Sequence, residues 1–171
     1  MAQERIFSPE GVLRETVGAG LCWWQERINM DRLRRERREK AREQLKKYGL
    51  GALLCFRDCN LIYVGSAIRL PYLTEAESFG PVPIGWRYLL FGGDKERPIL
   101  YEHGAIAEQQ AYHAPWLEVR HAQAPLLEHV VGLEAADSIV PKFVQQIKDD
   151  LKEMGALNEP VGIDIYSPRL E

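Results

Sequence analysis

The sequence predicts an α/β domain, in which a mixed sheet of five or six strands is flanked by helices. Short apolar runs alternate along the chain with segments of helical periodicity, as they do when strands and helices form separate layers. A Gly92-Gly-Asp bend between two apolar runs adds an antiparallel hairpin. With 171 residues, 46% of them hydrophobic, the chain is long enough for one full hydrophobic core.

The first predicted element is a helix over residues 30–48. Asn29 can cap it, Asp31 suits its positive end, and Gly49 provides the stop. Six residues recur at helical spacing and are expected on one face: Met30, Leu33, Arg37, Ala41, Leu45 and Tyr48.

Two apolar runs follow this helix. Ala52–Phe56 is continuously apolar and predicts a strand buried on both faces. Leu61–Val64 suits either a short helix or a strand. Ser66–Gly85 contains Pro71, Pro81 and Pro83 and predicts a long irregular segment, of a length that is often functional or disordered.

The second half alternates between strands and helices. Predicted strands cover 87–91 and 98–102 (the hairpin), 117–120 and 161–164, and predicted helices cover 105–112 and 136–154. Residues 125–131 suit a loop or a turn of helix. The last helix carries an apolar stripe formed by Val140, Phe143, Val144, Ile147, Leu151 and Met154.

Charge and composition exclude several classes of protein. A net charge of −3 argues against nucleic acid as the main partner, because phosphate binding needs a basic face. Nine Lys and Arg among residues 31–47, against four Asp and Glu, indicate either a solvated helix face or a docking strip for an acidic partner. The absence of a long apolar run argues against a membrane span, and the charged start and three cysteines favour the cytoplasm.

Three motifs in order resemble one known family. They are Gly49-Leu-Gly-Ala-Leu-Leu54, then Asn60-Leu-Ile-Tyr-Val-Gly65, then the two hairpin strands Tyr88-Leu-Leu-Phe91 and Pro98-Ile-Leu-Tyr101. Together they resemble the amino-terminal domain of creatinase, prolidase and Xaa-Pro aminopeptidase. That family has a segment of the type Asn-Ile-x-Tyr-Leu-Thr-Gly; here Val64 replaces the leucine and the threonine is absent.

The resemblance implies a domain organisation. Residues 29–165 would form a domain with a ribonuclease H-like fold, preceded by an arm (1–28) and followed by the start of a linker (166–171). Trp23 and Trp24 in the arm would pack locally or against a second subunit. The catalytic domain of such enzymes binds two divalent metal ions through two Asp, one His and two Glu, and it would follow Glu171. The resemblance thus implies no catalytic residue, metal ligand or cofactor within this chain.

In the family, the amino-terminal domain restricts access to the active site. The resemblance therefore implies three partners: the protein's own catalytic domain, a second copy in a homodimer, and a peptide or small-molecule substrate. The residues best placed for gating are Tyr63, Arg69, Tyr72 and Trp86. Arg69 could pair with a substrate carboxylate and the aromatic residues could hold a proline-like ring, although ordinary packing explains each of them equally well.

Other functions stay open. The chain could be a catalytically inactive module that binds peptides or proteins, or part of a lyase of this fold that cleaves dimethylsulfoniopropionate. A metal enzyme using His103, His113, His121 and His129 is disfavoured, because no two of them are four residues apart on one helix. Asp58 and Asp164 favour turn and capping roles over metal binding, and Glu102 and His103 should point to opposite faces of a strand.

Overall fold

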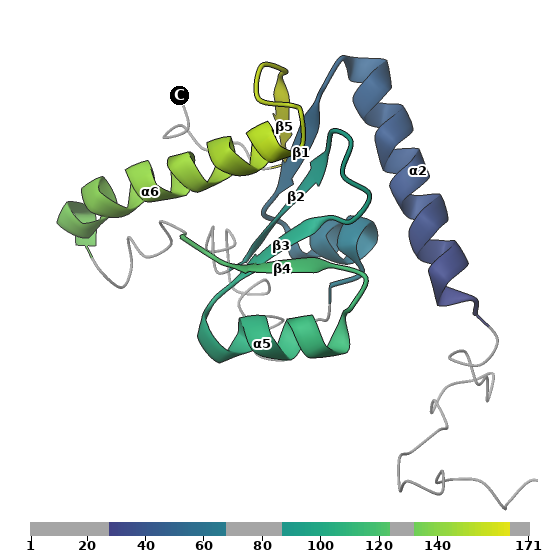
Figure 1. Cartoon of the computed structure of the whole chain (residues 1–171), viewed down its shortest axis with the longest axis horizontal. Helices are drawn as coiled ribbons and strands as arrows, with labels where there is room; N and C mark the ends of the chain where they lie inside the picture. The colour runs from purple at the N-terminus through teal and green to yellow at the C-terminus, as the bar shows by residue number, and fades with distance from the viewer. Residues whose placement is uncertain (1–27, 68–86, 124–131, 165–171) are drawn as a thin grey trace, which may run out of the picture. The chain divides into compact units, whose positions relative to one another are not determined.

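The fold is built around five strands, four of which run in the same direction (Figure 1). The structure is a computed structural model, and it describes residues 28–67, 87–123 and 132–164. Across the sheet the strands lie in the order β4 (Glu118–His121), β3 (Ile99–Glu102), β2 (Tyr88–Gly92), β1 (Ala52–Cys55) and β5 (Val161–Ile163). The predicted mixed sheet is thereby confirmed.

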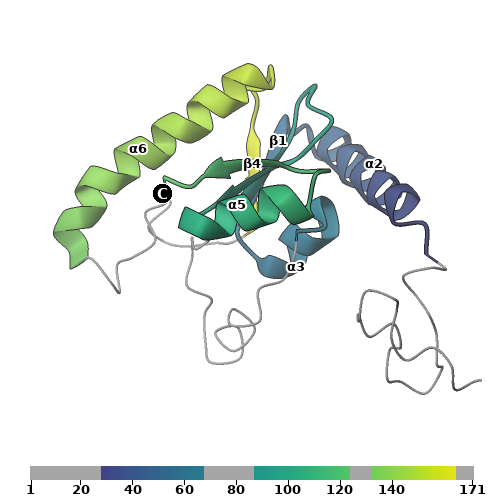
Figure 2. The ribbon, with the colours of Figure 1, turned by 60° about the horizontal axis from the view of Figure 1, so that its bottom comes forward.

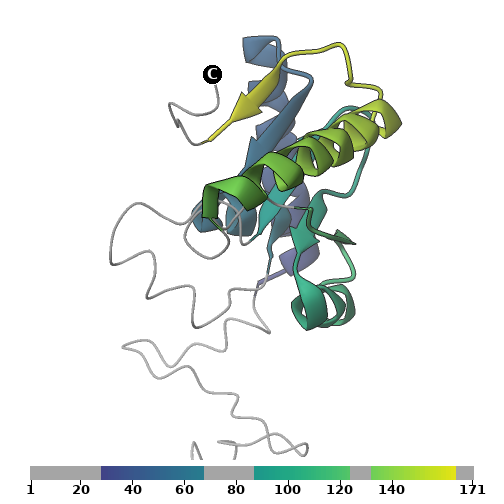
Figure 3. The ribbon, with the colours of Figure 1, turned by 90° about the vertical axis from the view of Figure 1, so that its left-hand side faces the viewer.

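Strand β2 is antiparallel to its two neighbours, whereas the outer pairs are parallel. Ala52 pairs with Gly92 and Tyr88 pairs with Tyr101, so the β2–β3 hairpin has the predicted position. Strand β5 runs parallel to β1, beside it at the edge of the sheet (Figure 3). Strand β4 runs parallel to β3 at the opposite edge.

The chain divides into two units, Met1–Glu36 and Arg37–Glu171. Of the first unit the structure describes residues 28–36, which include the start of helix α2 (Met30–Tyr48). The side chain of Asn29 accepts a hydrogen bond of 2.9 Å from the backbone N–H of Arg32, which confirms the predicted cap. All that follows concerns the second unit.

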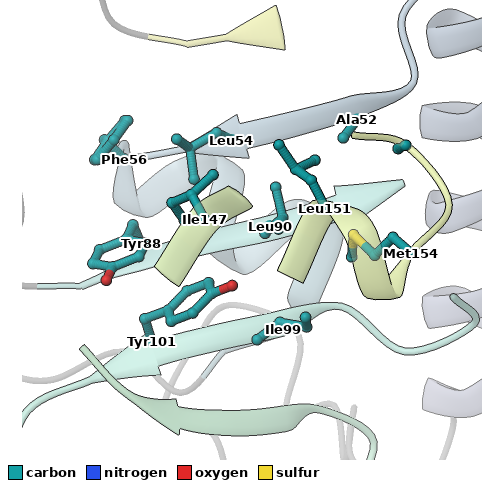
Figure 4. Packing of buried hydrophobic residues seen from close by; sticks show 11 residues of the cluster. Ala52, Leu54, Phe56, Tyr88, Leu90, Ile99, Tyr101, Ile147, Leu151 and Met154 are labelled. Carbon is teal, nitrogen blue, oxygen red and sulfur yellow. The ribbon is translucent and has the colours of Figure 1, made fainter. Parts of the chain in front are cut away.

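One face of the sheet is covered by helix α6 (Gly132–Glu153), which packs against apolar side chains of β1, β2 and β3 (Figure 4). Ile147, Leu151 and Met154 are buried there and Phe143 is partly buried, as predicted. The prediction was wrong for Val140 and Val144, which are exposed. Val144 lies about 100° around the helix from Phe143, and Val140 lies one turn before the first residue that packs on the sheet.

The other face is covered by the second part of α2, by helix α5 (Gly104–His113) and by the helical residues 58–65 that follow β1 (Figure 2). Leu45 of α2 is buried in this layer together with Cys55, Leu89 and Leu100. The buried strand β1 thus has side chains in both layers, as its apolar run predicts. Tyr48 does not lie on the buried face as predicted. It is 66% exposed at the last turn of α2, where the chain leaves the helix for Gly49.

The run Leu61–Val64 forms a helix, which is one of the two structures that its sequence allows. Asp58–Asn60 make the short helix α3, and Leu61–Gly65 continue it as the π-helical turn η1. A Cβ atom at Gly65 would lie 2.4 Å from Cδ1 of Leu89, so this position needs glycine for close packing on β2. The chain then turns at Ser66, whose φ of 50° is left-handed.

The basic strip of α2 is partly used inside the fold. Arg42 donates a hydrogen bond of 2.6 Å to the carbonyl of Lys95 and lies 4.8 Å from the centre of the Phe91 ring. Arg38 donates to the carbonyl of Glu96 at 3.3 Å. Neither a solvated helix face nor a docking strip for an acidic partner describes these two arginines, because both are bonded within the domain.

Several predictions lie outside the described residues. They concern the arm with Trp23 and Trp24, most of the segment 66–85, residues 125–131 and the linker 166–171. Within the described residues, no helix is both long and apolar enough to cross a membrane.

Candidate functional site

Polar and ionisable residues lie at one end of the sheet, the end at which four of its five strands finish. Because β1, β3, β4 and β5 run in the same direction, their carboxyl ends meet there, and antiparallel β2 begins there. We call this the carboxyl edge; its polar residues are Asp58, Asn60, Arg87, Glu102, His103, His121 and Asp164. In open α/β sheets, ligands usually bind beyond the carboxyl ends of the strands.

Asn60, the first residue of the Asn-to-Gly motif, is held by the end of β5. Its side-chain amide donates a hydrogen bond of 2.8 Å to Oδ2 of Asp164. The same carboxylate accepts bonds from the backbone N–H of Phe56 (2.8 Å) and of Arg57 (3.1 Å). Asp164 therefore fixes the turn between β1 and α3, in agreement with the predicted turn role, whereas α3 itself has no side-chain cap.

Arg87 lies between two carboxylates in the interior. Its Nη2 atom is 3.1 Å from Oδ1 of Asp58, and its Nη1 atom is 3.2 Å from Oε1 of Glu102. All three residues are buried, with Glu102 only 1% exposed. This cluster, the Asp58–Arg87–Glu102 cluster, links the turn after β1 to the hairpin β2–β3.

The electrostatics of the edge follow from burial. Burial raises the pKa of Glu102 to about 7; the charge of Arg87 opposes the shift and that of Asp58 adds to it. Burial also raises the pKa of the Cys55 thiol, and Asp164 adds to this effect. A thiol with such a pKa stays protonated and is a poor nucleophile at neutral pH.

Of the four predicted gating residues, the structure places Tyr63. It lies on η1, is 42% exposed, and has the guanidinium carbon of Arg37 5.3 Å from its ring centre. Its ring is thus partly accessible and lies within range of a cation–π interaction with Arg37. Arg69, Tyr72 and Trp86 lie outside the described residues, so the structure does not test whether the four come together.

The histidines are distributed over separate elements. His103 precedes α5, His113 ends it and His121 ends β4, while His129 lies outside the described residues. In the part of the chain that the structure describes, no three His, Cys, Asp or Glu side chains are grouped so that they could hold a metal ion. Glu102 forms an ion pair with Arg87.

A second polar network lies under α6. The hydroxyl of Tyr101 donates to the carboxylate of Asp150, which also accepts from Arg120 on β4. Tyr88 stacks on Tyr101 with ring centres 4.4 Å apart and donates a hydrogen bond of 2.8 Å to Gln146. An open groove of about 560 Å³ runs beside it, between the end of β4 and α6. The hydrogen bonds from Tyr101 and Arg120 to Asp150, and from Tyr88 to Gln146, attach α6 to the sheet.

Sequence reasoning missed the Asp58–Arg87–Glu102 cluster, although a signal for it exists. Tyr88 pairs with Tyr101, so the next pair toward the open end of the hairpin is Arg87 with Glu102. Opposite charges at facing positions of a predicted hairpin indicate a cross-strand ion pair. The third member, Asp58, has no such signal, because only the tertiary fold brings it to Arg87.

Comparison with known proteins gives a limited result. Neither a protein-family model nor a curated protein sequence matches this chain. Among solved structures it is similar to an Xaa-Pro dipeptidase from Bacillus anthracis, with 14% identity and a TM-score of 0.48 over 79% of this chain. The match spans 28% of the length of that dipeptidase.

Two further structures are covered almost completely. The N-terminal domain of the cytoplasmic peptidase PepQ from Mycobacterium tuberculosis is 18% identical, with a TM-score of 0.40 over 77% of this chain and 93% of that one. The aminopeptidase P, an Xaa-Pro aminopeptidase, from Streptococcus thermophilus is 16% identical, with a TM-score of 0.39 over 81% of this chain and 94% of that one. All three are peptidases. They are of the class that the sequence motifs resemble, and at these identities the likeness concerns the fold.

The polar groups of the carboxyl edge thus hold the turn after β1 and the start of the hairpin in position. The carboxylates of this edge are engaged by backbone amides, by Asn60 and by Arg87, and its buried thiol is protonated. Tyr63 lies on η1, which follows this edge in the chain and packs on the face of the sheet, and its ring is 42% exposed.

Proposed function

We propose that this chain is the amino-terminal domain of an Xaa-Pro peptidase-like metallohydrolase, where it restricts access to the active site and supports dimerisation. The observation that carries the proposal is the order of the three motifs together with the way the structure uses the second one. Asn60 donates a hydrogen bond to Asp164 and Gly65 packs on Leu89. The motif therefore holds the chain in place directly before residues 66–86.

In this proposal catalysis belongs to a domain that follows the chain. That domain would hold two divalent metal ions. This chain would pack over the active site and restrict it to small substrates. Tyr63 is the candidate that the structure describes, and Arg69, Tyr72 and Trp86 would act with it. The partners are the catalytic domain, a second copy of the protein and a peptide or small-molecule substrate.

The test begins with the coding sequence beyond Glu171. It should encode a domain with two Asp, one His and two Glu as metal ligands. The joined protein should then hydrolyse Xaa-Pro dipeptides only when a divalent ion is added, while residues 1–171 alone do not. A downstream sequence without these ligands, or a joined protein inactive on Xaa-Pro substrates, would overturn the proposal. Analytical ultracentrifugation of both forms tests the dimer.

A further inference from the structure

Strand β4 is the outermost strand of the sheet on the side away from β5 (Figure 1). Its inner edge is bonded to the chain of β3. The backbone N–H of Glu118 donates to the carbonyl of Pro98 at 3.0 Å, and the N–H of Ala122 donates at 2.8 Å to the carbonyl of the last residue of β3. Backbone groups of successive residues alternate between the two edges of a strand, so those of Val119 and His121 point away from the sheet.

Helix α6 closes one part of this outer edge and leaves another part open. The side-chain amide of Gln146 donates a hydrogen bond of 2.9 Å to the carbonyl of His121 and accepts one of 3.1 Å from the backbone N–H of Gln123. In the part of the chain that the structure describes, no group is bonded to the outward N–H and C=O of Val119. An edge strand with unpaired backbone groups can pair with a further strand.

The opposite edge of the sheet is less suited to pairing. Strand β5 has three residues, it directly follows Pro160, and its middle residue is Gly162. Short edge strands and prolines discourage the addition of a further strand, and glycine weakens a strand. Strand β4 has four residues and contains neither proline nor glycine. A further strand is therefore expected at β4 rather than at β5.

The charge pattern of β4 is complementary to a second copy of itself. In an antiparallel pair centred on Val119, this residue faces Val119 of the second copy, and Glu118 faces Arg120 of the second copy. Two-fold symmetry produces this opposite-charge pair twice. A pair centred on Arg120 would instead bring two arginines face to face, which is unfavourable. The sequence of the strand therefore favours one register.

Both charged side chains are within reach of a neighbouring strand. The side chain of Glu118 is 32% exposed and that of Arg120 is 25% exposed. Arg120 also lines the open groove between β4 and α6. Within its own chain Glu118 is bonded to Arg120 and, at 2.6 Å, to the ammonium group of Lys95. In the pair, each Glu118 would lie between cations of both copies.

We propose that two copies of this chain associate through the outer edges of their β4 strands, in an antiparallel pair centred on Val119. Each Val119 donates its N–H to the C=O of Val119 in the other copy, so the two sheets join into one. This pairing specifies the surface of the dimer proposed above. It rests on that proposal only in requiring that a dimer forms, and it is independent of the peptidase assignment.

Amide hydrogen exchange of the full chain, measured over a range of protein concentrations, tests the pairing without a variant. The N–H of Val119 should exchange rapidly in dilute solution and become protected as the dimer forms, which sedimentation equilibrium follows in parallel. The N–H of Ala122 is bonded to the chain of β3 and should be protected at every concentration. A chain that stays monomeric up to about 1 mM, or a dimer in which Val119 still exchanges rapidly, would overturn the pairing.

A matched pair of variants tests the backbone contact. Val119→Pro removes the outward N–H, at an edge position where proline breaks no bond of the sheet, and should abolish the dimer. Val119→Thr keeps both the N–H and the branched shape and should dimerise as the wild type does. Circular dichroism checks that both variants stay folded. If Val119→Pro still dimerises, the copies associate through another surface; β4 pairing is then wrong, while the proposed dimer remains.

The charge pairs have a separate test. Glu118→Gln removes an opposite-charge pair at two equivalent places and should raise the Kd of the dimer by about 2- to 30-fold. Its control is Glu43→Gln, which changes an exposed glutamate on α2 and should leave the Kd unchanged. An equal effect of both substitutions would contradict the proposed register.

Discussion

At the scale of single residues, Asp164 links the end of the described chain to the turn after β1. One carboxylate accepts three hydrogen bonds from residues 56–60, more than a hundred positions earlier in the chain. These bonds satisfy backbone N–H groups just after β1, where no strand partner is present for them. A charged acceptor also strengthens each bond relative to a neutral one.

We expect Asp164→Ala to lower the free energy of unfolding by about 1–3 kcal/mol, since it leaves two backbone donors and one side-chain donor unpaired. Asn60→Ala removes one of the three bonds and should cost less. Chemical denaturation of both variants and of the double variant checks this expectation. If the two losses simply add, the side chains do not act together as described.

Gly65 shows a different constraint, which comes from space and not from backbone conformation. In Gly65→Ala the new Cβ would meet Cδ1 of the fully buried Leu89 and lie 3.3 Å from Cδ2 of Leu117. We expect a loss of about 1–3 kcal/mol, as for other overpacked cores, measured as a lower thermal midpoint.

The control for this steric explanation is a second substitution in the same contact. Leu89→Ala should cost less in the Gly65→Ala background than in the wild type, because it removes the clashing methyl group. Equal costs in both backgrounds would show that crowding against Leu89 is not the cause.

At the scale of elements, α6 is attached to the sheet by both apolar and polar contacts. The buried Tyr101 and Tyr88 stack on each other and each directs its hydroxyl to α6. Their partners differ, because Asp150 is a carboxylate and Gln146 is a neutral amide. Burial raises the pKa of Tyr101, and its hydrogen bond to Asp150 adds to that shift, so this hydroxyl stays protonated as a donor.

This difference gives a matched pair of substitutions. Tyr101→Phe should lower the free energy of unfolding by about 1.5–3 kcal/mol, because it removes a bond to a charged acceptor that is nearly buried. Tyr88→Phe should cost about 0.5–1.5 kcal/mol. Both keep the stacked ring, so denaturation curves compare the hydroxyls alone. The reverse order would contradict the assignment of the stronger bond to Asp150.

Sequence patterns predicted the elements well where an apolar run was continuous. Ala52–Cys55 and Tyr88–Gly92 lie inside uninterrupted apolar segments and were placed within one or two residues. Helix α6 was predicted to begin at Ala136 but begins at Gly132, because residues 132–135 have no cap or periodic apolar face that marks a start. Asp58 illustrates the remaining limit, since its pairing with Arg87 depends on how η1 packs on β2.

At the scale of the whole domain, the direction of the strands decides where function can lie. Four carboxyl ends and the start of β2 converge on one edge, where Asn60 is bonded to Asp164. From there the motif Asn60–Gly65 runs over the face of the sheet to the contact of Gly65 with Leu89 and Leu117. The sequence predicted Tyr63 as a gating residue from the family resemblance. The ring is 42% exposed and lies 5.3 Å from the guanidinium carbon of Arg37, and its part in gating stays a prediction.

The last prediction concerns the protein joined to its proposed catalytic domain. Tyr63→Ala should raise KM for Xaa-Pro dipeptides by about 2- to 10-fold, which corresponds to the loss of one aromatic contact worth about 0.5–1.5 kcal/mol. Because Tyr63 is already 42% exposed, its removal should leave the thermal midpoint nearly unchanged. Tyr48→Ala is the control, since Tyr48 is 66% exposed at the end of α2 and outside the motif. If both variants change KM equally, or neither does, Tyr63 has no part in admitting substrate, and the gating proposal would have to rest on the segment 66–86 alone.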